Sequence, residues 1–310
     1  MSQRSALLLP SWRPGPVRDA VVGFLEAARD VAVVDRVAYF DNDGTLWCER
    51  PSYVQLDFFL DALRKRVEAN PSSGERDEFA AVLSGDAAAI AGIGLERIAL
   101  ALAGLFDGLT PEEFASATRA FMATAKHNSL GRPLRSVTYQ PMLELIDELR
   151  RREFTVGIVT GGGTEFVRAI SDDLYRVPAE LVVGTLIGYD FTRDEGDRPV
   201  IRRTSSILGA ANEGATKVTN IQTQLGRRPI LAAGNSGGDR EMLEWALATD
   251  GPALALLINH DDAEREFQYT SKAQTLVETE PITDVGTSLG WTIVSMARDW
   301  DVVFPPESGS

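Results

Sequence analysis

The feature that most constrains the fold is an alternation of short apolar runs with helical patterns. Helical periodicity is seen at residues 17–28, 164–174 and 215–225, in a stretch that begins at Pro141, and in another that runs through Trp245. Between these helices, apolar runs that are typical of buried strands occupy residues 36–40, 154–159, 229–233 and 253–258. Strands that alternate with helices predict an α/β fold with a largely parallel sheet covered on both faces.

Two stretches depart from this alternation. A short strand at residues 181–184 is followed by strand-like runs at 186–192 and 199–203, which flank the polar turn 193–198 and predict an antiparallel hairpin. Residues 47–135 show helical patterns and no convincing strand. We therefore expect a core formed by residues 1–46 and 136–310, with 47–135 inserted after the first strand as a helical cap over the end of that strand.

The charge balance argues against several classes of partner. The chain of 310 residues carries 31 Lys and Arg against 45 Asp and Glu, a formal charge of -14, which repels phosphate backbones and anionic lipid. The basic clusters at residues 150–152 and 227–228 lie at a helix end and before a strand, where solvated positions explain them. Nucleic acid is therefore not an expected partner.

Membrane insertion and disulfide bonding are not expected either. The most apolar region, residues 87–106, is interrupted by Glu96 and Arg97 and predicts a pair of packed helices. The apolar run at residues 6–9 is ended by Pro10 and is too short for the core of a signal peptide. The single cysteine, Cys48, has no partner for an internal disulfide. We expect a cytoplasmic protein.

The first predicted strand ends in two acids, Asp41 and Asp43. Residues two apart on extended backbone point to the same side, so the two carboxylates are aimed at one place. Carboxylates held that close attract a hard cation such as Mg²⁺ or share a proton. Taken alone, an Asp-x-Asp at a strand end is also typical of a simple turn with a helix-capping acid.

Two later strands also end in unusual loops. Thr160, Gly161 and Gly162 offer a hydroxyl and approachable backbone N–H groups that suit phosphate oxygens, and Lys217 adds a positive charge. A further loop, GNSGGD, follows the strand at residues 229–233. Because ligands of open parallel sheets gather beyond the carboxyl ends of the strands, the ordered combination of these loops predicts a functional site.

These residues resemble the haloacid dehalogenase-like hydrolases, in particular the phosphoserine phosphatase-like branch with a helical cap after the first strand. The first motif of that family, Asp-x-Asp-Gly-Thr, is matched by residues 41–45, the second by Thr160, the third by Lys217 and the fourth by the polar loop 234–239. The resemblance spans nearly the whole chain. It implies a Rossmann-like parallel sheet and a Mg²⁺-dependent phosphatase that acts on phosphomonoesters.

The resemblance also implies roles for individual residues. Asp41 is the expected nucleophile, which forms an aspartyl-phosphate, and Asp43 is the expected acid and base. Thr160, Gly161 and Lys217 are expected to hold phosphoryl oxygens. The implied Mg²⁺ ligands are the Asp41 carboxylate, the Asp43 main-chain oxygen and the loop that carries Asn235 and Asp239. Asn235 stands where many relatives have Asp, so the side chain that binds the ion directly, Asn235 or Asp239, stays open.

Rival functions can be ranked from the same residues. Dehalogenases do not need an acid two residues after the nucleophile, so Asp43 argues against that reaction. A binding or regulatory protein that keeps the fold without catalysis is the second hypothesis, and Asn235 is the residue that favours it. The charge of the chain favours a small phosphorylated metabolite as the partner. The oligomeric state stays open.

The roles that we expect for several other residues follow from their positions in the sequence. Glu49, Arg50 and Tyr53 follow the first motif at the start of the cap, so we expect them to face the leaving group of the substrate; an exposed helix start is the alternative. For His127, His260 and Cys48, packing or solvation is the expected role.

Overall fold

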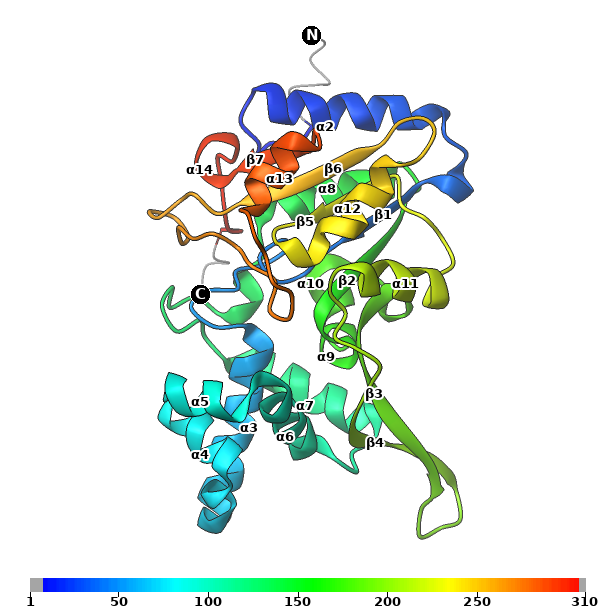
Figure 1. Cartoon of the computed structure of the whole chain (residues 1–310). Helices are drawn as coiled ribbons and strands as arrows, with labels where there is room; N and C mark the ends of the chain where they lie inside the picture. Colours follow the sequence, from blue (N-terminus) through cyan, green and yellow to red (C-terminus); the bar gives the residue numbers. More distant parts are fainter. Residues whose placement is uncertain (1–7, 307–310) are drawn as a thin grey trace.

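The computed structural model describes residues 8–306 and shows a sheet of seven strands in the order β4-β3-β2-β1-β5-β6-β7 (Figure 1). All neighbouring strands are parallel except the last pair at one edge, β3 and β4. The strands are β1 (Val37–Phe40), β2 (Thr155–Gly163), β3 (Val182–Arg193), β4 (Pro199–Leu208), β5 (Leu231–Gly234), β6 (Leu254–Asn259) and β7 (Thr292–Ser295).

The sheet is covered on both faces, as the alternation of elements predicts. β1 is buried along its whole length, and its residues alternate between the two faces: Ala38 and Phe40 belong to one hydrophobic core, and Val37 and Tyr39 to the other. The first core is closed by α2 (Pro16–Ala27) and α8 (Gln140–Arg151), and the second by α11 (Ala215–Gln224), α12 (Arg240–Leu247) and α13 (Ile282–Ser288).

The central strands end at one edge. Phe40, the last residue of β1, pairs with Ile158 of β2 and Ala233 of β5. The residues that follow these three positions are therefore brought to the same side of the sheet, beyond its carboxyl edge, where ligands of such folds bind.

The segment between β1 and α8 is helical and contains no named strand. It comprises α3 (Val54–Ala69), α4 (Asp77–Ser84), α5 (Ala87–Ile93), α6 (Leu95–Ala103) and α7 (Pro111–Thr124), with short 3-10 turns at Pro71–Glu75 and Gly104–Phe106. These helices gather apart from the sheet, beside the β3–β4 hairpin (Figure 1), and α3, α4 and α6 share a small core of their own. The helical insertion is as predicted; the boundaries at residues 47 and 135 stay a prediction.

The β3–β4 hairpin joins this insertion to the sheet. The main chain of Arg203 in β4 accepts from the Gly108 N–H at 2.9 Å and donates to the Leu109 carbonyl at 2.8 Å. The Arg203 guanidinium is buried against the Glu165 carboxylate and lies 3.9 Å over the ring of Phe114 in α7. The hairpin was predicted, whereas its contact with the cap was not.

The structure also differs from the sequence prediction in detail. β2 does not end before the TGGG run but continues to Gly163, which pairs with Thr185 after an irregularity in the register. The two short runs at 181–192 form one strand, β3, and the predicted helix 164–174 is divided into α9 (Thr164–Arg168) and α10 (Ser171–Tyr175) because Ile170, with φ -129, leaves the helical conformation. β7, α13 and α14 (Met296–Asp299) were not predicted, because their short, half-polar sequences carry little periodicity.

The apolar region at residues 87–106 forms helices that meet at a bend of 89°. Among the described residues, no single helix is long and apolar enough to cross a membrane, and this bent pair reaches the required length and composition only when the two are taken together. Ala6 and Leu7 of the apolar run near the amino terminus lie outside the described residues.

Candidate active site

The ammonium group of Lys217, which donates hydrogen bonds to two carboxylates, lies at the centre of the site. Lys217, in the first turn of α11, places its Nζ 2.6 Å from Asp41 Oδ1, 2.6 Å from Asp239 Oδ1 and 2.9 Å from the Val159 carbonyl oxygen. All three charged side chains are buried. Burial alone would lower the pKa of Lys217, but Asp239 and Asp41 raise it above its ordinary value, so the side chain stays charged.

Asp41 and Asp43 are held by the loop that follows β1. The Asp41 N–H donates to the Ala233 carbonyl of β5 at 2.9 Å, which continues the sheet by one residue. Asp43 Oδ1 accepts from Trp47 Nε1 at 2.8 Å. Gly44 has φ +73, and a Cβ there would stand 1.9 Å from the Asn235 side chain, so this turn requires glycine.

Burial shapes the acid–base properties of both carboxylates. Burial and then the charge of Asp239 raise the pKa of Asp41 well above its ordinary value, against the opposing effect of Lys217. Burial likewise raises the pKa of Asp43, against hydrogen bonds from Trp47 and Asn42. Asp43 is therefore placed to retain a proton.

Thr160, Gly161 and Gly162 form the irregular part of β2 beside these acids. The Thr160 hydroxyl hydrogen-bonds Asp43 and accepts from the Gly162 N–H at 3.0 Å. The Gly161 carbonyl accepts from the Thr185 hydroxyl at 2.7 Å, and this bond holds the strand in place through the run of glycines. The glycine backbone consequently lies at the site without leaving the sheet.

The loop at residues 234–239 uses Asp239 to hold its own backbone. Asp239 Oδ2 accepts from the N–H of Asn235 at 3.0 Å and of Ser236 at 3.1 Å, while Oδ1 is bonded to Lys217. The Asn235 amide Nδ2 donates to Glu49 Oε1 at 3.1 Å and to Ser271 Oγ at 3.2 Å. Both Asp239 oxygens are thus occupied, whereas Asn235 keeps its amide oxygen.

A cavity with about 370 Å³ of empty volume joins these groups. Its lining includes Asp41, Asp43, Gly161, Lys217 and Asn235, together with two of the residues that we expect at the start of the cap, Glu49 and Tyr53. Arg50 is not part of the lining; its guanidinium lies 4.5 Å over the ring of Tyr269. The structure therefore brings most of the motif residues to one cavity. Thr160 and Asp239 do not line it and touch it only through Asp43 and Lys217, and Arg50 lies outside the lining.

The family model for haloacid dehalogenase-like hydrolases matches residues 38–244, which hold every one of these motifs. The chain belongs to this family. No curated protein matches it.

Solved structures resemble the chain at low identity. A protein of unknown function from Bordetella pertussis Tohama I is 16% identical, with a TM-score of 0.50 over 84% of this chain and 98% of that one. A functionally unknown protein from Anaerococcus prevotii is 15% identical, with a TM-score of 0.51 over 79% and 86%. A probable phosphoserine phosphatase from Vibrio cholerae is 14% identical, with a TM-score of 0.41 over 85% and 70%. At these identities the likeness supports the fold alone.

Members of this hydrolase family generally use Mg²⁺, and the donor atoms of the site fit that ion. Within residues 8–306, no group of three or more His, Cys, Asp or Glu side chains is arranged for a metal. The predicted shell does not need such a group, because it combines the Asp41 carboxylate with a main-chain oxygen of Asp43 and an oxygen from the loop that carries Asn235 and Asp239. All three are hard oxygen donors. The acids Asp41, Asp43 and Asp239 also outnumber the single ammonium of Lys217, so a divalent cation suits the charge of the site.

Sequence reasoning missed the side of the cavity built from a loop after β6. Lys272 and Gln274 line the cavity together with Glu213, Ser236 and Gly238. Glu213 accepts from the N–H groups of Gln274 at 3.0 Å and Thr275 at 2.8 Å, and so holds the loop against the core. This polar, aperiodic stretch gave no signal, and it lies beyond the part of the chain matched by the family model.

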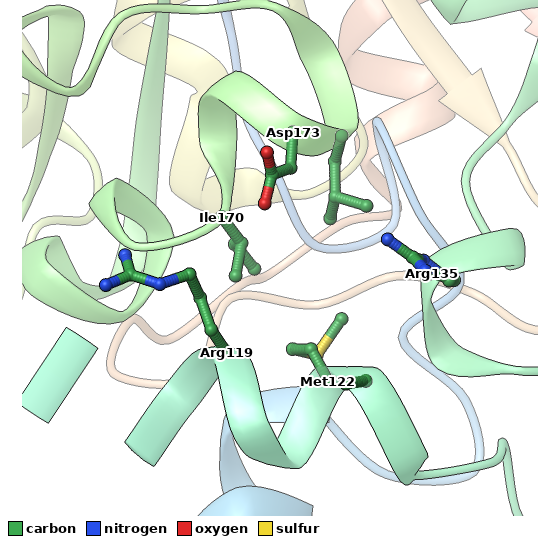
Figure 2. Close-up of a pocket in the computed structure, with 7 residues that line it drawn as sticks. Arg119, Met122, Arg135, Ile170 and Asp173 are labelled. Atoms are coloured by element: carbon green, nitrogen blue, oxygen red, sulfur yellow. The ribbon is translucent and has the colours of Figure 1, made fainter. Parts of the chain in front are cut away.

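A second pocket lies away from this chemistry. Figure 2 shows it between α7, which carries Arg119 and Met122, and the region of Ile170 and Asp173, with Arg135 on a third side. None of the motif residues lines it. We therefore take the cavity at the carboxyl edge of the sheet, which holds the motif residues, as the candidate site.

The remaining polar residues weighed in the sequence are buried. Burial and the nearby Glu266 raise the pKa of the Cys48 thiol, so no feature activates it as a nucleophile. His127 Nδ1 accepts from the N–H groups of Ser129 at 3.3 Å and Leu130 at 3.1 Å. His260, by contrast, contacts the first motif itself, which the sequence did not indicate.

Proposed function

We propose that the protein is a Mg²⁺-dependent phosphomonoester hydrolase that acts on a small phosphorylated metabolite through an aspartyl-phosphate intermediate. The observation that carries the proposal is the hydrogen bond from Lys217 to Asp41, beside Asp43, in one cavity. A carboxylate fixed next to a cation and next to a second acid is suited to attack on a phosphoryl group.

In the first step, Asp41 attacks phosphorus. Its Oδ1 is bonded to Lys217, whereas its Oδ2 accepts only a long hydrogen bond of 3.5 Å from the Thr45 hydroxyl, so Oδ2 is the more available oxygen. The new O–P bond forms as the ester P–O bond breaks, and Asp43 gives its proton to the departing alkoxide. The raised pKa of Asp43 supports this role, because the acid must hold a proton before the step.

In the second step, water attacks the phosphorus of the aspartyl-phosphate. Asp43 takes a proton from that water, the Asp41–phosphorus bond breaks, and inorganic phosphate leaves with Asp41 again a carboxylate and Asp43 again protonated. Lys217, the Thr160 hydroxyl and the Gly161 backbone hold the phosphoryl oxygens during both steps.

Asp41, the main chain of Asp43 and Asn235 would hold Mg²⁺, with Asp239 positioning the loop that presents Asn235. When bound, the ion supplies positive charge that offsets the repulsion between an anionic nucleophile and an anionic phosphate. The choice of Asn235 as the direct ligand rests on the two occupied oxygens of Asp239.

Glu49 and Tyr53 are the proposed contacts to the leaving group, because they line the same cavity from the start of the cap. The formal charge of -14 favours a small phosphorylated metabolite over a nucleic acid. Arg50 is proposed to act only through Tyr269, on which it stacks.

The test is phosphate release from a panel of phosphorylated sugars, amino acids, cholines and nucleotides, with and without Mg²⁺. Asp41→Asn removes the nucleophile, so turnover is expected to fall by at least about a thousandfold while the fold is retained. Asp61→Asn, which changes a surface acid paired with Lys65, is the matched control and is expected to keep normal turnover. Wild-type turnover in Asp41→Asn would remove Asp41 from the mechanism.

The competing hypothesis is a binding or regulatory protein that keeps the fold. It predicts no phosphate release from any member of the panel, together with Mg²⁺ binding that Asp41→Asn weakens.

A further inference from the structure

His260 lies directly behind the loop that carries Asp41 and Asp43. Its side chain has no exposed surface, and each ring nitrogen faces an oxygen: Nε2 is 2.9 Å from the Gly44 carbonyl and Nδ1 is 3.3 Å from Glu266 Oε2. A carbonyl oxygen can only accept, so Nε2 carries a proton. The state of Nδ1 then depends on Glu266.

The surroundings of Glu266 are those of an ionised carboxylate. Its Oε1 accepts from the Tyr139 hydroxyl at 2.9 Å and from Cys48 Sγ at 3.0 Å, and its Oε2 accepts from the Phe267 N–H at 2.6 Å. An ionised Glu266 requires a proton on Nδ1, which makes His260 an imidazolium.

The His260 ring contacts two groups that lie next to the cavity, the Gly44 carbonyl and the Tyr269 side chain. Through Nε2 it holds the carbonyl of Gly44, the residue next to Asp43. Through its face it stacks on the ring of Tyr269, with centroids 4.4 Å apart and planes inclined at 24°. The Tyr269 hydroxyl donates to Glu49 Oε1 at 2.8 Å, and the positive charge of His260 opposes the effect of burial on the pKa of Glu49.

We propose that His260, as a buried imidazolium paired with Glu266, is a positioning residue that holds the first-motif loop through Gly44 and the Glu49 side chain through Tyr269. The proposal extends the phosphatase mechanism to a residue that touches neither phosphate nor metal. The expected effect of His260 on catalysis rests on the proposed function, whereas the expected charge state of His260 does not.

The chain provides an internal control in its other histidine. His127 is also buried, but its Nδ1 accepts two backbone N–H groups and therefore carries a lone pair. His127 is thus a neutral imidazole with its proton on Nε2. The two histidines of the sequence are expected in different charge states at the same pH.

Nitrogen-15 NMR of the wild-type protein labelled on histidine tests the charge state without any assay of activity. At neutral pH the expected spectrum shows one doubly protonated ring, because both nitrogens of His260 face oxygen acceptors, and one neutral ring. The doubly protonated ring is assigned by its loss in His260→Gln and its retention in His127→Gln. Two neutral rings in the wild-type spectrum would overturn the proposal.

Steady-state kinetics then test positioning. In His260→Ala the catalytic loop loses its donor, so kcat is expected to fall about 10–100-fold with little change in KM, while His127→Ala keeps normal kcat. His260→Gln retains a donor for Gly44 and is expected to recover part of the loss. Normal kcat in folded His260→Ala, or equal loss in His127→Ala, would contradict a positioning role. Phosphate release by the wild-type protein is measured alongside, so that failure of the proposed function is recognised separately from failure of this inference.

Discussion

At the scale of single residues, the ion pairs of Lys217 compensate the negative charges of the site. Its ammonium is shared between Asp41 and Asp239, and the three side chains lie almost wholly out of solvent. Burying charges is expensive, so such a group is stable only while each charge has a partner. Removal of the lysine would leave two carboxylates facing each other without a cation.

Lys217→Met is therefore expected to lower the free energy of unfolding by about 3–5 kcal/mol at neutral pH without added metal. Urea unfolding followed by circular dichroism measures the change. Lys65→Met is the matched control, because Lys65 forms an exposed pair with Asp61 at 2.6 Å, and its loss should cost no more than about 0.5 kcal/mol. Similar losses in the two variants would mean that the buried carboxylates are not ionised around Lys217.

At the scale of elements, the cap is held together partly by one acid between helices. Glu78, in the first turn of α4, accepts from Arg76 Nε at 2.8 Å and from Arg97 Nε of α6 at 2.6 Å. The pKa of Glu78 is lowered from 4.5 to about 2. The hydrogen bond from Arg76 is the largest cause, and the hydrogen bond from the backbone N–H of Glu78 itself is the next. The ionised acid thereby links two cap helices.

The sign of the resulting pH effect follows from this lowered pKa. The contribution of Glu78 to stability is fully present above its ordinary pKa of 4.5 and is lost as the pH falls toward about 2. Glu78→Gln should therefore reduce the melting temperature near neutral pH, with the difference from wild type disappearing in acid. Thermal unfolding across this range measures it, with Glu96→Gln at the exposed start of α6 as the control. A difference that persists at about pH 2 would show that packing, rather than charge, is responsible.

At the scale of the whole molecule, the cavity is closed by segments that are far apart in sequence. Tyr53 comes from the start of the cap and Gln274 from the loop after β6, and the two side chains are hydrogen-bonded to each other. The core loops supply the groups proposed for phosphate and metal, so the segments around Tyr53 and Gln274 are left to contact the rest of the substrate.

Tyr53→Ala is expected to lower kcat/KM for the preferred substrate of the screen by about tenfold more than for p-nitrophenyl phosphate, because the small ester lacks the natural leaving group. Parallel kinetics on both compounds measure the ratio. Tyr189→Ala, which changes an exposed tyrosine of the β3–β4 hairpin, should leave both unchanged. Equal losses on the two substrates in Tyr53→Ala would assign Tyr53 to the core site or to the fold.

The motif segments were located correctly from the sequence where the information is local. A buried apolar run that ends in Asp-x-Asp places Asp41 and Asp43 at the end of β1, because strand direction and side-chain alternation follow from neighbouring residues. The parallel sheet, the hairpin and the helical insertion likewise follow from periodicity along the chain. The roles of these residues stay predictions.

The tertiary structure alone decided what lies around those segments. Lys272 and Gln274 reach the cavity because Glu213, more than fifty residues away, binds the backbone of their loop. His260 reaches the Gly44 carbonyl across a separation of 216 residues. Such contacts depend on where distant segments meet in space. The sequence of a loop without periodicity does not indicate which distant segment it will contact. The sequence by itself therefore determined the sheet and the acids at its edge, whereas packing determined which side chains surround them.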